Sequence, residues 1–194
     1  MLPAKWGGVT DDAQDFKYLK WKAFELDKLF EIHSTSSSID KKKLNGVLGT
    51  TPYITRSGGD NGIGLFVSEQ KKYKKDNGNV ITIGLDTQTV YYQPSAFYTG
   101  QNIQILANNK INRYTALFVI PLIKKQMVKF NWGGNGATLG RLRKLCLLLP
   151  ATSDGDPDFA FMEKYMKRQE SKLLGLYAAN KLKEYQSEED SRML

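Results

Sequence analysis

The chain has 194 residues, a length that favours one domain, or one domain with an appendage. Hydrophobic residues make up 41% of it, which is enough for a core and excludes a wholly disordered chain. The 28 Lys and Arg residues against 20 Asp and Glu residues leave a net charge of +8, which favours a polyanionic partner. One cysteine excludes an internal disulfide, and one cysteine with one histidine argues against structural zinc, so we expect no metal and no cofactor.

Export and membrane signals are absent from the sequence. The first six residues, Met1 to Trp6, lack the apolar segment of a signal peptide. The longest apolar stretch covers residues 116–123, contains Pro121 and is far shorter than a membrane span. We therefore expect a cytoplasmic protein that has no membrane partner.

Positive charge is concentrated in the first 150 residues. They hold 21 basic and 11 acidic side chains, whereas residues 151–194 hold 7 basic and 9 acidic ones. No carboxylate occurs between Asp86 and Asp154, although eight Lys or Arg residues do. A solvated surface normally mixes both signs, because like charges repel each other. We expect this segment to form one positive flank that binds nucleic acid; chance and general solubility are the alternatives.

Short strands dominate the first part of the chain. Residues 21–32 indicate a strand that leads into a short helical turn, and the polar residues 33–43 indicate a loop. Four Asn-Gly pairs, at 45–46, 61–62, 77–78 and 135–136, are typical of tight hairpin turns. The strands expected after this loop cover residues 53–55, 64–67, 79–83, 88–92, 103–107 and 145–150. We expect the last strand to be buried, with Cys146 in the core.

Two helices are predicted. The first covers residues 114–127, and Pro121 within it predicts a kink or an early end. The second covers residues 158–186, about 42 Å, after Asp158 as its N-cap. Seven residues of this helix occupy the a and d positions of one heptad pattern and form a stripe along it: Phe159, Met162, Met166, Gln169, Leu173, Leu176 and Asn180.

The stripe has two interpretations. In the first, the helix packs on its own domain. In the second, it pairs with another long helix, and the length of the helix favours this second interpretation. In the second case the dimerisation residues are Phe159, Met162, Met166, Leu173 and Leu176. The expected fold is α/β, with a target-recognition domain of short strands and helices over residues 1–152 and a long coiled-coil-type helix over residues 153–194.

Catalytic motifs are not found. The glycine-rich residues 133–140 lack the Gly-Lys-Ser/Thr ending of a phosphate-binding loop. The carboxylates near residues 157–164 have the wrong spacing for a metal-dependent nuclease, and His33 lies in a polar loop. We therefore expect no catalytic residues and a binding protein.

Basic clusters and loop amides are the candidates for contacts to double-stranded DNA. The candidate phosphate contacts are Lys41, Lys42, Lys43, Lys71, Lys72, Lys124, Lys125, Lys129 and Arg141. Base reading needs paired donors and acceptors, and the candidates for it are Arg56, Asn61, Gln93 and Asn131, with Asn108, Asn109 and Asn135 as further loop positions. The sequence does not rank them.

An ordered series of short motifs carries a family resemblance. The series comprises Trp21-x-x-Phe24-x-Leu26-x-x-Leu29-Phe30-x-Ile32, Thr51-Pro52-Tyr53-Ile54-Thr55-Arg56, Asn61-Gly62-Ile63, Asn79-Val80-Ile81-Thr82-Ile83, Tyr92-Gln93-Pro94-x-x-Phe97-Tyr98, Ala116-Leu117-Phe118, Lys129-Phe130-x-Trp132-Gly133 with Arg141-Leu142, Leu148-Leu149-Pro150 and Asp154-Gly155-x-Pro157-Asp158. Over about residues 18–186 the chain resembles the DNA-specificity (S) subunits of type I restriction–modification systems, most closely the branch serving enzymes that fuse methylation and cleavage.

The resemblance implies a protein without chemistry of its own. Such subunits read one half of a split DNA site and position a methyltransferase and, in some systems, a nuclease on it. Family members usually carry two recognition domains joined by two long antiparallel helices, and this chain has one of each. The resemblance therefore implies a half-subunit that forms a homodimer through its helix, a truncated product, or half of a longer protein.

Two other function classes remain open at this point. The first is an adaptor that binds a methyltransferase through the helix without reading bases. The second is a nuclease that acts alone. Charge reversal at Lys124, Lys125 and Lys129 distinguishes the adaptor from the recognition subunit, because it should abolish DNA binding by the recognition subunit and leave assembly with the methyltransferase intact in either case. Cleavage of a plasmid without a partner would identify the nuclease.

Overall fold

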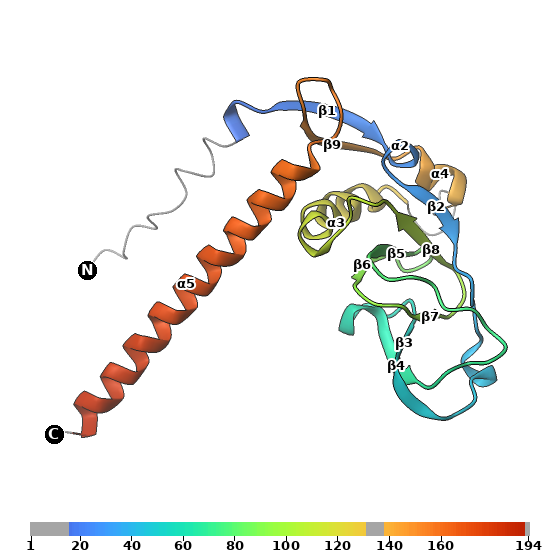
Figure 1. The fold of residues 1–194 in the computed structure, drawn as a ribbon, viewed down its shortest axis with the longest axis horizontal. Helices are drawn as coiled ribbons and strands as arrows, with labels where there is room; N and C mark the ends of the chain where they lie inside the picture. Colours follow the sequence, from blue (N-terminus) through green and yellow to red (C-terminus); the bar gives the residue numbers. More distant parts are fainter. Residues whose placement is uncertain (1–15, 131–137, 193–194) are drawn as a thin grey trace.

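The computed structural model describes residues 16–130 and 138–192. Short strands make up most of the elements, helices are interspersed among them, and a long helix forms the C-terminal end of the described residues (Figure 1). No described helix is both long and apolar enough to cross a membrane. The expected α/β class and the long C-terminal helix are confirmed.

Nine strands and four α-helices are described. The strands are β1 (Lys20–Glu25), β2 (Glu31–Ser34), β3 (Leu48–Ile54), β4 (Ile63–Val67), β5 (Val80–Gly84), β6 (Thr89–Gln93), β7 (Tyr98–Thr99), β8 (Ile103–Ala107) and β9 (Cys146–Ala151). The α-helices are α2 (Leu26–Leu29), α3 (Arg113–Met127), α4 (Leu139–Arg143) and α5 (Phe159–Arg192), and two 3-10 turns are η1 (Lys41–Lys43) and η2 (Asp60–Gly62).

The strands form three small sheets. β1 and β9 make an antiparallel ribbon. A four-stranded antiparallel sheet has the order β2-β8-β5-β6, and a three-stranded sheet has the order β4-β3-β7, in which β3 and β7 are parallel. The tight turn between β5 and β6 is closed by Gln88 with φ 56°, so no Asn-Gly pair forms this hairpin.

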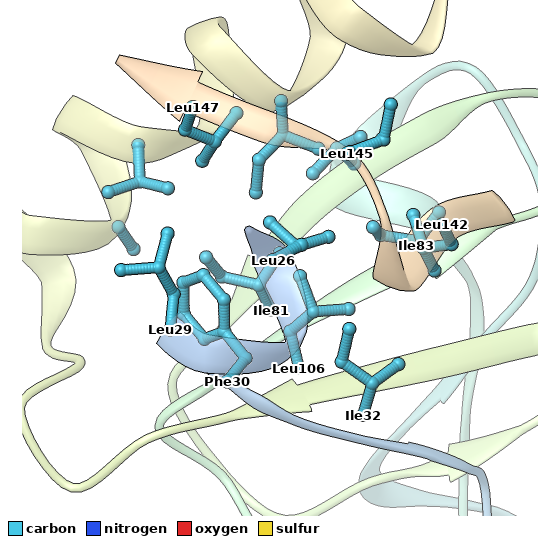
Figure 2. Close-up of a cluster of buried hydrophobic side chains, with 14 of the residues drawn as sticks. Leu26, Leu29, Phe30, Ile32, Ile81, Ile83, Leu106, Leu142, Leu145 and Leu147 are labelled. Carbon is cyan, nitrogen blue, oxygen red and sulfur yellow. The ribbon is translucent and has the colours of Figure 1, made fainter. Parts of the chain in front are cut away.

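The four-stranded sheet is buried on both faces. Ile81 and Ile83 of β5 point to one face and Val80 to the other, because successive side chains in a strand alternate. The first face packs against α2, α3 and α4. Ile81 and Leu106 lie near Leu26 and Phe30, and Ile83 lies near Leu142, in one apolar cluster (Figure 2). The opposite face packs against the three-stranded sheet. All five residues of β5 are consequently buried.

The ribbon of β1 and β9 is covered on one face only. Leu147 and Leu149 point inward and are buried, whereas Leu148 is 57% exposed and Cys146 is exposed. The predictions of a fully buried strand and of a core position for Cys146 are therefore wrong. Residues of β9 alternate between the core and the outer face because, among residues 16–130 and 138–192, no layer covers the outside of the ribbon.

Helix α3 begins with a capping box and continues beyond its proline. The Asn112 side chain accepts hydrogen bonds from the backbone N–H groups of Tyr114 and Thr115, and the Thr115 hydroxyl accepts one from the Asn112 N–H. Pro121 does not end the helix, which continues to Met127. Pro121 is exposed, so its ring and the backbone group that it leaves unpaired lie on the solvent face.

Helix α5 divides into a buried beginning and an exposed remainder. Its 34 residues span about 51 Å. Phe159 and Met162 are 8% and 0% exposed and belong to the main core, whereas Leu173 and Leu176 are 67% and 58% exposed. The expectation that Phe159 and Met162 are dimerisation residues is therefore wrong, because the domain of the same chain covers them. Beyond this region α5 projects away from the sheets (Figure 1).

Replacing Met162 with alanine should lower the free energy of unfolding by about 2–5 kcal/mol, because it leaves a cavity between α5 and α3. Leu174→Ala is the matched control, since Leu174 is 62% exposed, and should change the stability by less than about 0.5 kcal/mol. Urea unfolding followed by circular dichroism measures both values. Equal losses of stability in the two variants would contradict the division of α5 into a buried beginning and an exposed remainder.

Candidate nucleic-acid interface

Two basic stretches of the sequence, residues 41–43 and 71–75, meet at the end of the three-stranded sheet. Lys43 approaches Lys71 and Lys72 around an open hollow of about 310 Å³, which Asn45, Glu69, Gln70 and Tyr73 also line. We call these residues the tip hollow. Lys43 belongs to η1, before β3, and the other lysines follow β4. The antiparallel pairing of β3 with β4 therefore brings together two clusters that lie 28 residues apart in the sequence.

Hydrogen bonds fix the backbone of the tip hollow. The Asn45 side-chain amide donates to the Ser68 hydroxyl at 3.0 Å and to the Glu69 carbonyl at 3.1 Å. The amide of Gln70, a residue only 3% exposed, donates to the Asn45 side-chain oxygen at 2.8 Å. The lysines thus extend from a hydrogen-bonded frame.

The carboxylate of the tip hollow is neutralised by a neighbouring lysine. Lys75 Nζ lies 2.7 Å from Glu69 Oε2, and the Tyr98 hydroxyl donates to Glu69 Oε1 at 3.1 Å. The hydrogen bond from Lys75, followed by that from Tyr98, lowers the pKa of Glu69 below its ordinary value. Within the described part of the chain, Lys43, Lys71 and Lys72 form no ion pair. The hollow therefore presents a net positive charge to solvent.

A second basic group surrounds the loop between β3 and β4, residues 55–62. The Tyr91 hydroxyl of β6 donates to the Ser57 carbonyl of this loop, and Lys124 Nζ of α3 lies 5.2 Å from the centre of the Tyr91 ring. We call Arg56, Asn61, Tyr91 and Lys124 the loop group. Tyr91 connects the loop to α3, and no sequence signal singled it out.

Gln93 supports the loop instead of facing solvent. It is 2% exposed, and its side-chain amide donates to the Asn61 carbonyl at 3.2 Å and to the Thr82 hydroxyl at 3.1 Å. The Asn61 side chain donates to the Tyr92 carbonyl at 2.8 Å, and its backbone has φ 53°. Gln93 is therefore removed from the candidate base readers, whereas Asn61 stays at the exposed loop surface with one donor engaged.

Arg56 of the loop group pairs with Asp86, which also accepts a hydrogen bond from Asn102 at 3.0 Å. The other predicted residues lie outside the tip hollow and the loop group. Lys125 and Lys129 are exposed at the end of α3. Arg141 lies in α4, and Asn131 lies outside the described residues.

The carboxylate-free segment does not form a single flank. Lys124 belongs to the loop group, but Arg113 pairs with Glu170 of α5, and Arg143 donates to the Ile32 carbonyl at 3.2 Å. The expectation of one positive flank is therefore wrong. The two basic groups are instead built from β3, β4 and α3, and η1 and the loop before β4 lie on opposite sides of the small sheet (Figure 1). Among the described residues no cluster of His, Cys, Asp and Glu suits a metal ion.

Comparisons with known proteins agree with the fold. The family model described as the type I restriction modification DNA specificity domain matches residues 18–178. A curated relative is the specificity subunit S.BcgI of a type II restriction enzyme from Heyndrickxia coagulans, which is 32% identical over 173 residues. That match covers 87% of this chain but 48% of the relative, so the chain spans about half of that protein.

Solved structures share the fold at low identity. The S subunit of a type I restriction–modification system from M. genitalium is 13% identical, with a TM-score of 0.56 over 84% of this chain and 42% of that chain. The HsdS subunit from Thermoanaerobacter tengcongensis is 15% identical, with a TM-score of 0.52 over 82% of this chain and 39% of that chain.

Replacing Gln93 with leucine should leave the Asn61 carbonyl and the Thr82 hydroxyl without their donor and lower the free energy of unfolding by about 1–3 kcal/mol. The Thr55 amide, which donates to the Gly62 carbonyl at 2.7 Å, should exchange hydrogen faster. Gln101→Leu, at an exposed position, is the control. Unchanged exchange at Thr55 would show that Gln93 does not hold the loop.

Proposed function

The chain belongs to the type I restriction modification DNA specificity domain family, and on this premise we propose that it is a non-catalytic recognition subunit that reads one half of a bipartite DNA site. The observation that supports the proposal beyond the family is the tip hollow. There, three lysines that pair with no carboxylate of the described residues converge on a hydrogen-bonded frame. A concave cluster of cations on fixed backbone suits phosphates of a duplex.

We assign the predicted residues two parts in DNA binding, contact with phosphates and reading of bases. The proposed phosphate contacts are Lys41, Lys42, Lys43, Lys71, Lys72, Lys124, Lys125, Lys129 and Arg141. Arg56 and Asn61 on the loop between β3 and β4 are the proposed base readers, because their side chains offer the donor and acceptor patterns that distinguish base edges. Asn131 keeps this role as a prediction from the sequence. DNA methylation, and any cleavage, would be supplied by partner subunits.

The proposed division of labour follows the chain. We propose residues 1–152 as the recognition domain and residues 153–194 as the spacer segment, whose helix α5 has its first turns anchored in the core. The exposed part of α5 carries Leu173, Leu176, Tyr177 and Leu182, each more than half exposed. Such a surface favours a second helix as its neighbour. We propose a homodimer through these residues, with half-exposed Met166 at its margin.

Replacing Lys43, Lys71 and Lys72 with alanine should weaken duplex binding for all sequences alike and reduce the slope of log K against log salt by up to about 3, one for each phosphate that the variant no longer neutralises. The control replaces the exposed Lys28, Lys164 and Lys183 of α2 and α5, and should leave the slope nearly unchanged. Fluorescence anisotropy over a salt series measures both. An unchanged slope in the first variant would reject the tip hollow as a phosphate site.

Base specificity distinguishes the proposed recognition subunit from the alternative, an adaptor that binds a methyltransferase through its helix without reading bases. Selection from a random duplex pool should return one bipartite sequence for the recognition subunit. Equal affinity for all duplexes, together with intact binding to a methyltransferase partner, would support the adaptor instead.

Light scattering at micromolar concentration should give about twice the chain mass of 21.9 kDa. Replacing Leu173 or Leu176 with aspartate should return the monomer without changing circular dichroism of the core, because both side chains are exposed. A wild-type protein of single chain mass would reject the homodimer.

A further inference from the structure

Polar contacts join α3 to α5 close to the point where α5 leaves the domain. Arg113 donates to Glu170 Oε1 at 2.6 Å, and the Tyr114 hydroxyl donates to Glu170 Oε2 at 2.8 Å. Both oxygens of one carboxylate of α5 are therefore bound by neighbouring residues in the first turn of α3. From Leu173 to Asn180 every residue of α5 is exposed, so Glu170 lies within one turn of the end of the packed region.

A second carboxylate, Glu163, about two turns earlier, is held in the same way. Asn112 donates to Glu163 Oε2 at 3.0 Å, and Lys167 lies 2.6 Å from Glu163 Oε1. The Lys167 ammonium also lies 5.2 Å from the centre of the Tyr114 ring. Hydrogen bonding to Glu170, followed by burial, raises the pKa of Tyr114 above its ordinary value. We call Asn112, Arg113, Tyr114, Glu163 and Glu170 the helix latch.

The contacts of the helix latch are more numerous than anchoring needs. Phe159 and Met162 already bury the first turns of α5 in the core. An isolated exposed ion pair adds little to stability, and Arg113 is 62% exposed. The latch adds something different, because it fixes the direction of the helix at the last packed turn. Without it, the pivot of α5 would lie more than one turn earlier, near Tyr165, whose ring meets that of Phe118 of α3 edge to face with the centroids 5.9 Å apart.

The direction of α5 matters because a small change of its angle moves its far end by several ångströms. The 22 residues of α5 that follow Glu170 span about 33 Å. Turning a rod of this length by about 6° displaces its far end by about 3.4 Å, the rise of one base pair. A helix that sets the distance between two recognition domains must therefore be held to within a few degrees for the spacing to be defined to one base pair.

We propose that the helix latch, and Glu170 in particular, is a positioning device that determines which spacer length between two half-sites the protein accepts. This inference rests on the proposed function, since it requires two half-sites and a second recognition domain at the far end of α5. Glu170 does not touch DNA in this proposal. It acts by fixing the angle between α5 and α3.

The test is a competition among duplexes that carry the selected half-sites at spacers differing by single base pairs. The wild type should prefer one spacer. Glu170→Ala should keep the base preference within each half-site but reduce the discrimination against spacers one base pair longer or shorter by about fivefold, which corresponds to the removal of an exposed bidentate hydrogen-bonded pair. Arg113→Lys keeps the ion pair and should retain most of the wild-type preference.

Glu69→Gln is the matched control. It breaks another exposed ion pair, that with Lys75 at the tip hollow, and should shift affinities equally at all spacers. If Glu170→Ala binds too poorly to be measured, Tyr114→Phe removes one hydroxyl and provides the same comparison. A single preferred spacer retained by both variants would overturn the latch alone. A wild type without any bipartite preference would overturn the proposed function and the latch with it.

Discussion

The insertion of the first turns of α5 into the main core is the constraint on which the rest of the structure depends. Met162, fully buried, joins the long helix to the same apolar cluster that includes Ala116, Val119 and Ile123 of α3. Helix α3 in turn covers one face of the four-stranded sheet. Because interiors pack densely, this series of contacts holds the first turns of the helix in place on the sheets. Domain and helix therefore form one unit despite their different shapes.

The same layered arrangement gives the basic groups their rigidity. The three-stranded sheet packs on the outer face of the four-stranded one through Ile54 and Phe97, with Ile103 and Ile105 on the other side of the contact. Its end carries the tip hollow, and its loop between β3 and β4 is tied to β6 by Gln93 and Tyr91. Cations on ordered backbone lose less conformational entropy on binding a phosphate than cations on a free loop do.

Sequence patterns predicted those strands and helices well whose positions are determined by the local periodicity of apolar residues. The strand over residues 103–107 and the helix near residues 114–127 have their expected places, since alternation and a 3.6-residue period are local properties. Burial of Cys146 was mispredicted, because a run of leucines does not reveal whether one or two faces of a strand are covered. Gln93 was mispredicted as a base reader for a related reason: its hydrogen bonds to Asn61 and Thr82 depend on tertiary contacts. The meeting of Lys43 with Lys71 depends on the pairing of β3 with β4, which composition cannot specify.

The uneven distribution of charge along the chain follows from these contacts. The acidic tail brings Glu163 and Glu170 to α3, where Asn112 and Arg113 meet them. Part of the positive charge of the carboxylate-free segment is thus used inside the molecule, and only the remainder is directed to solvent. Where a carboxylate lies beside a basic group, as Glu69 does, a neighbouring cation neutralises it. A strong local potential at the tip hollow is therefore compatible with a modest net charge of +8, because local pairing, rather than the overall sum of charges, sets the field that a phosphate meets.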